Sequence, residues 1–442
     1  MKLTVIGCGY VGLTAAACLA SAGSGQVVGY EIDRLRMEQL QAGICPINEP
    51  GLEELLQCGI SHKRLAFTGE AKTAMRDVDI FLIAVGTPAA FDGSPNLNLL
   101  HRAVNTIAEH MTRSATVIIK STIPPGGTET VRHWFYEALV QPDLKINLVY
   151  CPEFLREGNA VSDFILPQRI VAGGSDESAV RQAAALHQMC CTETVPVLYT
   201  TARNAELIKY ASNSFLALKV AFINELARLC NKAGGEIDEV AHGMGLDSRI
   251  SSEYLHAGIG YGGACLPKDI QGLTGFARTA GEPLPILEQV IRSNETHQER
   301  IADFIHENVP NGQVIGVWGL TFKAGSDDLR SSPSLSLIRR LADKGCYRFQ
   351  LYDPTVHMQQ LDQLCGVEHI CAQTPAQAVQ NTDALLIIVP WGEFQAQTLC
   401  DAIDSMHKKR IFDLCRLCKD EWFETHDVRY WRLGGRQNYG KD

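Results

Sequence analysis

The sequence predicts an α/β protein with two Rossmann-like, doubly wound domains joined by a long central helix. Three observations support this fold class. A glycine-rich turn near the N-terminus separates an apolar strand from an alanine-rich helix, residues 203–233 have helical periodicity without glycine or proline, and a second strand–helix–strand pattern starts at residue 313. Strands that alternate with helices are typical of parallel sheets covered on both faces.

The length and charge of the chain restrict what it can be. Its 442 residues exceed one ordinary core, and we expect a nucleotide-binding Rossmann domain over 1–200, a central helical domain over 201–300 and a C-terminal Rossmann-like domain over 301–442. The net charge of −10 argues against binding to nucleic acid or an anionic membrane, because both require clustered lysine and arginine. No signal peptide or membrane span is visible, so a cytoplasmic protein with reduced thiols is expected.

The N-terminal strand, residues 3–6, is followed by the turn GCGYVG at 7–12 and by a helix that stops at Gly23. A second strand, QVVGYEI, ends at the acid Glu31. Strand, GxGxxG turn, helix, strand and terminal acid within about thirty residues form the unit that binds dinucleotides. A tight turn without a ligand would leave the acid unexplained.

Each position of the glycine turn has its own task. Gly7 permits the tight turn, Gly9 lets the backbone approach a pyrophosphate, and Gly12 allows helix and strand to pack closely. The free N–H groups at the helix N-terminus face the phosphates, and Tyr10 and Val11 complete the expected contact set.

Glu31 favours NAD over NADP as the cofactor. Its carboxylate accepts hydrogen bonds from the ribose hydroxyls and would repel a 2′-phosphate. Arg34 and Arg36, just beyond it, weaken this preference.

Two later apolar strands end in hydroxyl side chains. DIFLIAVGTP reaches Thr87, and ATVIIKSTIPPGG passes through Thr122. Ligands of open parallel sheets bind at the carboxyl ends of the strands, so both threonines are candidates to contact a nucleotide. Either one is otherwise an ordinary loop or helix-cap residue.

The segment CPEFLREG follows the strand INLVY and contains two acids, Glu153 and Glu157. They are four residues apart, so they share a face if the segment is helical. Their place at a strand end makes an acid–base role as reasonable as the alternative, which is two solvated surface acids.

The helix expected over 203–233 carries Lys209 and Asn213 one turn apart among apolar residues. Such a lysine is either a snorkelling surface residue or a buried cation held for an oxyanion, and the neighbouring amide donor favours the second interpretation. The local pattern alone does not decide between them. A helix this long and apolar runs between domains or into a subunit interface.

Of the 15 cysteines, Cys265 has the most suggestive surroundings, the loop GYGGACLPKD. Its glycines bring backbone N–H groups close to a ligand, Lys268 favours thiolate over thiol, and Asp269 could relay protons. A small buried hydrophobe is the alternative. The CxxC that ends at Cys418 has no second pair or histidine motif, so we expect no metal site.

Together these motifs resemble the nucleotide-sugar dehydrogenases of the UDP-glucose/GDP-mannose dehydrogenase family. Seven motifs in the family's order cover nearly the whole chain, which is far more specific than any one of them. They are GCGYVGL (7–13), VGTP (85–88), ST (121–122), PEFLREG (152–158), ELIKYASNSFLALK (206–219), GYGGACLPKD (260–269) and GLTFKAGSDDLRSSPS (319–334).

The resemblance implies a four-electron oxidation of UDP-glucose at C6 to UDP-glucuronate, with two NAD reduced. It also implies a reason for the thiol: Cys265 captures the intermediate aldehyde as a thiohemiacetal, whose oxidation gives a thioester that water hydrolyses. A homodimer or dimer-based oligomer is implied as well, with Arg249 arriving from a neighbouring subunit.

The resemblance assigns site residues position by position. The implied catalytic residues are Cys265 as nucleophile, Lys209 and Asn213 at the oxyanion, Asp269 and Thr122 for water and proton transfer, and Glu157 and Glu153 near the reacting carbon. The implied cofactor contacts are Gly7, Gly9, Tyr10, Val11, Gly12, Glu31, Arg36, Thr87, Thr122, Glu157, Lys268 and, from the second lobe, Arg330. The implied substrate contacts are Phe154, Leu155, Arg156, Glu157, Lys209, Asn213, Arg249, Tyr254, Leu255, Gly258, Gly262 and Lys323.

Two positions depart from the family pattern: Cys151 stands where asparagine is usual, and Glu31 where aspartate is usual. Neither change removes the required chemistry. GDP-mannose is the alternative substrate, because that branch uses the same catalytic residues, while UDP-N-acetylhexosamine dehydrogenases fit less well around the cysteine loop. A binding protein that has lost activity would not require a thiol, and a two-electron hydroxyacid dehydrogenase would use neither Cys265 nor a second nucleotide-binding lobe.

Overall fold

The computed structural model describes residues 1–90, 93–356, 360–361, 364–417 and 428–435. The chain divides into two compact units, one formed by 1–212 with 275–281 and the other by 213–274 with 282–442. Helix α9 (Ala202–Ala233) contributes residues to both units, as the long helix expected from the sequence. The division into three domains at residues 200 and 300 stays a prediction.

The first unit is built on an eight-stranded sheet with the order β3-β2-β1-β4-β5-β6-β7-β8. Neighbouring strands are parallel except β6 and β7, which pair antiparallel. The strands are β1 (Lys2–Ile6), β2 (Gln26–Tyr30), β3 (Leu65–Thr68), β4 (Ile80–Ile83), β5 (Ala115–Ile119), β6 (Ile146–Tyr150), β7 (Ile170–Gly174) and β8 (Val197–Thr200). The order reverses between β1 and β4, and this is where open α/β sheets bind ligands.

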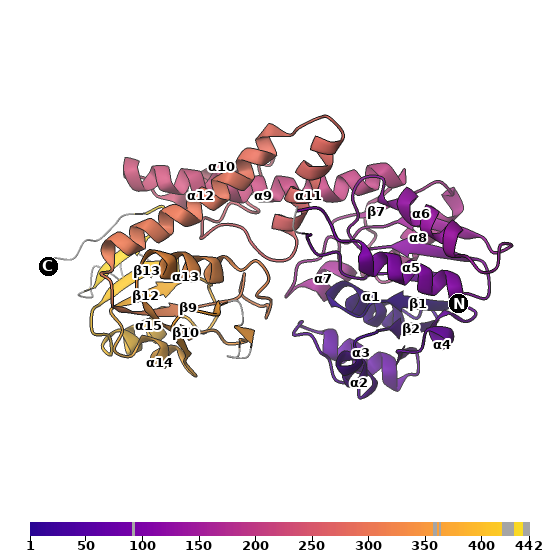
Figure 1. Ribbon diagram of the computed structural model, residues 1–442, viewed down its shortest axis with the longest axis horizontal. Helices are drawn as coiled ribbons and strands as arrows, with labels where there is room; N and C mark the ends of the chain where they lie inside the picture. The colour runs from indigo at the N-terminus through magenta and orange to yellow at the C-terminus, as the bar shows by residue number, and fades with distance from the viewer. Residues whose placement is uncertain (91–92, 357–359, 362–363, 418–427, 436–442) are drawn as a thin grey trace. The chain divides into compact units, whose positions relative to one another are not determined.

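Helices cover both faces of this sheet (Figure 1). Along β4, Ile80 and Leu82 enter one buried cluster and Phe81 and Ile83 the other, because successive strand side chains point to opposite faces. On the first face lie α1 (Tyr10–Ser21), α3 (Leu52–Ser61), α7 (Ala160–Ile165) and α8 (Glu177–Gln188). On the second lie α4 (Ala71–Met75), α5 (Asn98–His110) and α6 (Gly127–Ala138), while α2 (Arg34–Gln41) follows β2. The doubly wound arrangement predicted from the sequence is confirmed.

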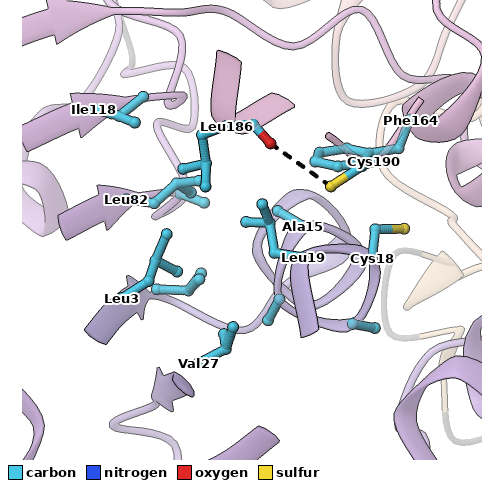
Figure 2. Packing of buried hydrophobic residues seen from close by; sticks show 14 of the residues in the cluster. Leu3, Ala15, Cys18, Leu19, Val27, Leu82, Ile118, Phe164, Leu186 and Cys190 are labelled. Atoms are coloured by element: carbon cyan, nitrogen blue, oxygen red, sulfur yellow. Dashed lines mark hydrogen bonds between the residues drawn. The ribbon is translucent and has the colours of Figure 1, made fainter. Parts of the chain in front are cut away.

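Helix α1 is buried along most of its length, from Gly12 to Ala20. Its small side chains allow close packing on the sheet, and Figure 2 shows Ala15 and Leu19 of this helix among Leu3, Leu82 and other core residues. The burial of these small apolar side chains therefore holds the N-terminus of α1 firmly against the ends of the central strands.

The glycine turn between β1 and α1 has the geometry that the sequence predicts. Gly7 has a φ of +87°, which favours glycine, and its N–H donates to Tyr30 O at 2.9 Å. A Cβ at Gly12 would lie 1.8 Å from Gly7 O, whereas a Cβ at Gly9 would meet no atom within 4 Å. Gly12 thus serves packing and Gly9 leaves the backbone open. Tyr10 begins α1.

The second unit contains a six-stranded, all-parallel sheet with the order β11-β10-β9-β12-β13-β14. Its strands are β9 (Val314–Trp318), β10 (Arg348–Tyr352), β11 (His369–Cys371), β12 (Ala384–Ile387), β13 (Arg410–Asp413) and β14 (Arg429–Arg432). Its helices are α10 (Ile237–Gly245), α11 (Leu266–Thr279, shared with the first unit), α12 (Pro285–Asn308), α13 (Pro333–Lys344), α14 (Pro375–Val379) and α15 (Ala396–Ile403). Helices α12 and α13 bury one face, and α14 and α15 the other. The predicted second Rossmann-like lobe is confirmed.

The glycine turn yields a matched pair of variants. We expect Gly12→Ala to lower the free energy of unfolding by about 3 kcal/mol, because its methyl group must displace the Gly7 carbonyl from a packed core. Gly9→Ala should cost under about 1 kcal/mol, the penalty of alanine at a helix N-cap. Urea denaturation of both variants tests the difference, and equal losses would contradict it.

Candidate active site

Glu31, directly after β2, is tied to the glycine turn. Its Oε2 accepts the N–H of Cys8 at 3.0 Å, and its Oε1 accepts the N–H groups of Ile32 at 2.8 Å and Asp33 at 2.9 Å. The guanidinium of Arg36 lies 3.7 Å from Oε2. The carboxylate is thereby fixed beside the turn, in the position from which an acid contacts a ribose.

The loops that follow β4 and β5 contact each other at Thr87 and Thr122, two of the residues expected to bind the nucleotide. The hydroxyl of Thr87 donates to Thr122 O at 2.9 Å, and the hydroxyl of Ser121 donates to Val85 O at 2.7 Å. Thr87 is buried and Thr122 is partly buried. The structure therefore brings both threonines together at the carboxyl edge of the sheet.

The segment after β6 is not helical, so the condition under which Glu153 and Glu157 would share a helical face is not met. Glu153 Oε2 accepts the N–H of Leu155 at 2.6 Å, and such a local bond competes with helical hydrogen bonding. A helix starts only at α7, where Glu49 accepts the N–H of Ala160 at 2.6 Å. Glu153 is buried, whereas Glu157 lies partly exposed in the turn before α7.

Glu153 instead forms a buried ion pair with Lys209 of α9. Lys209 Nζ lies 2.7 Å from Glu153 Oε1 and 2.8 Å from Glu153 O, and the Lys209 and Glu153 side chains are only 3% and 9% exposed. Burial raises the pKa of the Glu153 carboxyl, but the Lys209 ammonium, the Leu155 N–H and Lys120 together outweigh burial and hold that pKa below its ordinary value. Lys209 is thus a buried cation and not a snorkelling surface residue.

An aromatic ring lies beside this ion pair, and a second cation packs against the same ring. The ring of Phe154 lies under two cations, 5.3 Å from Lys209 Nζ and 4.1 Å from the guanidinium carbon of Arg169. Arg156 is exposed and makes a two-pronged ion pair with Asp163 of α7, at 2.8 and 3.0 Å. The Arg156 side chain therefore stiffens the loop in which Glu157 lies.

One turn along α9 from Lys209, Asn213 is held by a second acid. Asn213 Nδ2 donates to Asp269 Oδ2 at 2.6 Å, and Lys268 Nζ donates to the other oxygen of the same carboxylate. Asp269 is fully buried in the first turn of α11, and its N–H donates to Cys265 O at 2.9 Å. Cys265 itself is exposed directly before that helix, and backbone N–H groups at a helix N-terminus favour a thiolate.

The glycines of the cysteine loop allow it to pack closely against the loop that follows β9. A Cβ at Gly262 would lie 2.4 Å from Ser331 O, and a Cβ at Gly263 would lie 2.7 Å from the ring of Phe322. Gly263 has a φ of +80°, and its N–H donates to Ser331 O at 3.3 Å. Cys265 is therefore presented by a loop with little room to move.

Two expected cations lie on that same loop after β9. Lys323 is partly buried, with its Nζ 5.6 Å from the ring centre of Phe322. Arg330 forms a two-pronged ion pair with the buried Asp328 at 2.7 and 2.9 Å, and 62% of its side chain is exposed. The structure thus places both cations and the cysteine loop in the second unit.

The remaining expected substrate contacts lie between α10 and α11. Arg249 is exposed and pairs with Asp247 at 2.6 Å, Tyr254 has a φ of +63°, and Leu255 is buried in the core. Gly258 lies partly buried further along the same segment. Of these four residues, only Leu255 belongs to the hydrophobic core of the second unit.

Several residues that support this site were missed in the sequence. Asn294 of α12 accepts the Tyr261 N–H at 2.9 Å and donates to Tyr261 O at 3.2 Å, and Asn224 of α9 accepts the Gly258 N–H at 2.8 Å. Lys120 lies buried at the end of β5. A lysine that ends an otherwise apolar strand was a readable signal, whereas the two asparagines resemble many polar helix residues.

The described residues form neither a metal site nor a membrane span. That part of the chain contains no group of three histidine, cysteine or acidic side chains placed to bind a metal. Cys418, the second cysteine of the CxxC, lies outside the described residues. None of the described helices combines the length and apolar character needed to cross a membrane.

Three protein-family descriptions match consecutive parts of the chain. Residues 1–191 match the NAD binding domain of the UDP-glucose/GDP-mannose dehydrogenase family, residues 203–296 match its central domain, and residues 316–420 match its UDP binding domain. All three belong to one family and occur in its order.

Similar proteins cover nearly the whole chain. The UDP-glucose 6-dehydrogenase of Rhizobium meliloti is 38% identical over 98% of this chain and 99% of its own length. UDP-glucose 6-dehydrogenase YwqF of Bacillus subtilis is also 38% identical, over 93% of each chain. A solved UDP-glucose dehydrogenase from Pyrobaculum islandicum matches with a TM-score of 0.88 and 34% identity over 98% of both chains.

The buried ion pair predicts a pH-dependent loss of stability. We expect Lys209→Met to lower the free energy of unfolding at pH 7 by about 3–5 kcal/mol, because Glu153 is left buried without a counterion. In the wild type the lowered pKa of Glu153 gives stability above its unfolded value, near pH 4, that is lost as the pH falls through the folded value. In Lys209→Met, burial without a counterion raises the pKa of Glu153. Acid therefore protonates Glu153 and removes the free-energy cost of its buried charge.

Urea denaturation between pH 7 and pH 4 tests this expectation. The difference between wild type and Lys209→Met should shrink as the pH falls. Lys145→Met, at an exposed lysine before β6, is the control and should differ from wild type by under about 0.5 kcal/mol at every pH. A Lys209→Met deficit that grows in acid would contradict the account.

Proposed function

The chain belongs to the UDP-glucose/GDP-mannose dehydrogenase family, and from this premise we propose that it oxidises UDP-glucose at C6 to UDP-glucuronate through a thioester on Cys265. The choice of UDP-glucose as the substrate is supported by the full-length similarity to UDP-glucose 6-dehydrogenases. The chain is an NAD-dependent nucleotide-sugar dehydrogenase. GDP-mannose, the alternative weighed from the sequence, receives no support from these relatives.

The residues of the first unit fit NAD. The open space at Gly9 leaves the backbone free to approach a pyrophosphate at the N-terminus of α1, and the fixed Glu31 carboxylate suits a ribose diol. NAD, when bound, supplies the hydride acceptor for both oxidations. We propose that it is held by Gly7, Gly9, Tyr10, Val11, Gly12, Glu31, Arg36, Thr87, Thr122, Glu157, Lys268 and Arg330.

The proposed reaction removes two hydrides from C6. The first oxidation takes a proton from the C6 hydroxyl and a hydride from the carbon, which leaves an aldehyde. Cys265 Sγ then bonds to that carbon while the oxygen gains a proton, and this thiohemiacetal loses a proton and a second hydride to become a thioester. Water attacks the carbonyl carbon, the C–S bond breaks, and the carboxylate leaves with the thiol restored.

The other proposed catalytic residues manage charge and protons. Lys209 and Asn213 offer an ammonium and an amide donor from one turn of α9, a pair suited to the negative oxygen that develops at C6. Asp269 accepts a hydrogen bond from Asn213, which supports a role in orienting that amide and in handling the water's proton together with Thr122. Glu153 positions Lys209 through their ion pair.

The nucleotide sugar is proposed to bind mostly through residues around the cysteine loop. Lys323 supplies positive charge suited to a diphosphate, and Gly262 supplies close backbone approach. The full proposed set is Phe154, Leu155, Arg156, Glu157, Lys209, Asn213, Arg249, Tyr254, Leu255, Gly258, Gly262 and Lys323.

Replacing the nucleophile tests this scheme. We expect Cys265→Ser to lower kcat by on the order of 10³-fold or more, because a neutral hydroxyl is a poor nucleophile and its ester a slow intermediate. Intact-protein mass spectrometry after incubation with UDP-glucose and NAD should show either a covalent adduct at the introduced serine or no adduct together with loss of the second oxidation. Cys346→Ser, at an exposed cysteine in the same unit, should keep full activity. Undiminished turnover by Cys265→Ser would refute the thioester scheme.

We further propose a homodimer formed through α9, in a protein of the cytoplasm. Phe215, Phe222 and Leu229 are spaced by seven residues along α9 and are 60%, 44% and 60% exposed, which forms an apolar stripe on one helix face. Lys219 of the same helix donates to Ile250 O at 3.0 Å and so ties the segment that carries Arg249 to this helix. A second copy on the stripe would receive that arginine.

A negative charge introduced into the apolar stripe of α9 should separate the subunits. We expect Phe222→Glu to convert a dimer into the 48.5 kDa monomer and to reduce turnover, since Arg249 then loses its place in a neighbouring pocket. Light scattering after size-exclusion chromatography measures the mass. Tyr136→Glu, which changes an exposed aromatic residue of α6, should remain dimeric. A wild-type protein that is monomeric at micromolar concentration would contradict the proposal.

A further inference from the structure

Lys120 is a buried lysine that the proposed mechanism does not use. It follows the five buried residues of β5 and is 3% exposed. Its Nζ donates to Cys151 O at 3.2 Å, lies 3.8 Å from Cys151 Sγ, and stands 5.8 Å from the ring centre of Phe164. Among the described residues no carboxylate lies within ion-pair distance of it, and a buried charge without a direct partner is expensive.

The titratable side chains of α8 and the residues just after it that interact electrostatically with Lys120 are uncharged near neutral pH. Burial, with a contribution from Lys120, lowers the pKa of His187 in α8 to about 3. Burial raises the pKa of Cys190 to about 12 and also raises that of Cys191, in both cases against the opposing effect of Lys120. These groups therefore cannot neutralise the ammonium.

The carboxylate that does respond to Lys120 is Glu153. Burial raises the pKa of Glu153. The charge of Lys209 and the hydrogen bonds that Glu153 accepts from Lys209 and Leu155 lower it, and Lys120 lowers it further. Lys120 and Lys209 thus act on the same acid from two different elements, the end of β5 and helix α9. Lys209 is the ion-pair partner of Glu153, whereas Lys120 is not within ion-pair distance of it.

The two lysines also hold the same short stretch of backbone. Lys120 binds the carbonyl of Cys151, Lys209 binds the carbonyl and the carboxylate of Glu153, and only Pro152 separates these residues. The Cys151 N–H donates to Ile119 O at 3.0 Å, but Pro152 has no N–H to continue this pairing, so carbonyls and side chains supply further anchorage. Lys120 supplies one of those anchors.

On the basis of the proposed function, we propose that Lys120 is a positioning residue of the oxidation: by binding the Cys151 carbonyl it holds residues 151–153, so that Glu153 keeps Lys209 in place. Lys120 touches no reacting atom in this role. It acts through the position of Glu153, so its effect on the rate disappears when the ion pair between Glu153 and Lys209 is removed.

A double-mutant cycle on turnover tests this dependence. We expect Lys120→Met to lower kcat at least about tenfold with the KM for UDP-glucose changed less than about threefold, and Lys120→Arg to recover most of the rate because a guanidinium can reach the same carbonyl. Glu153→Gln combined with Lys120→Met should turn over within about twofold of Glu153→Gln alone. Lys145→Met is the surface control and should match wild type.

Two results would overturn the proposal. One is a Lys120→Met enzyme within about twofold of the wild-type kcat, and the other is a double variant whose loss equals the product of the two single losses, which indicates independent structural effects.

The same cycle on equilibrium unfolding at pH 7 separates this proposal from the proposed function. A coupling of at least about fivefold in the unfolding constant between Lys120→Met and Glu153→Gln is expected whether or not UDP-glucose is the substrate. A folded wild type that does not oxidise UDP-glucose but shows this coupling contradicts the proposed function and supports the connection between Lys120 and Glu153. An active wild type without coupling contradicts the role of Lys120.

Discussion

A lysine ammonium buried in a protein is costly without a counter-charge, and the pairing of Lys209 with Glu153 supplies one. The pair fastens helix α9 to the backbone that leaves β6, because Lys209 also binds Glu153 O. One turn further, the buried amide of Asn213 requires an acceptor, and Asp269 provides it at the start of α11. Two polar residues on one turn of α9 therefore each hold one acid, and the Asp269 N–H in turn donates to Cys265 O.

The local features of this protein were predictable, because the physics that requires them is local. Gly7 needs a positive φ and Gly12 leaves no room for a Cβ, so the glycine pattern indicates the nucleotide turn without knowledge of the fold. The spacing of Lys209 and Asn213 likewise follows from helical periodicity. Glu153 was harder, because its partner lies 56 residues away and its bond to the Leu155 N–H competes with the helix on which a shared face with Glu157 depended. Asn294 gave no signal, since only the folded cysteine loop shows what it binds.

The proposed chemistry explains why one thiol differs from the others. Burial raises the pKa of Cys8 and Cys18, which keeps both protonated and unreactive, and packing is sufficient to explain them. Cys265 is exposed at the start of a helix, on a loop whose glycines permit contacts that no larger residue would allow. A reaction that must hold an aldehyde between two oxidations needs a nucleophile of this kind, and its covalent capture prevents loss of the intermediate. Next to it in the chain, Lys268 and Asp269 already have fixed partners, because both Lys268 and Asn213 donate to the Asp269 carboxylate.

The number of NADH molecules formed for each UDP-glucose consumed by the purified wild-type protein tests the central claim most directly. Covalent capture at Cys265 predicts two NADH per UDP-glucuronate, with no aldehyde free in solution at any time during the reaction. One NADH per substrate, with a released sugar aldehyde as the product, would contradict the account.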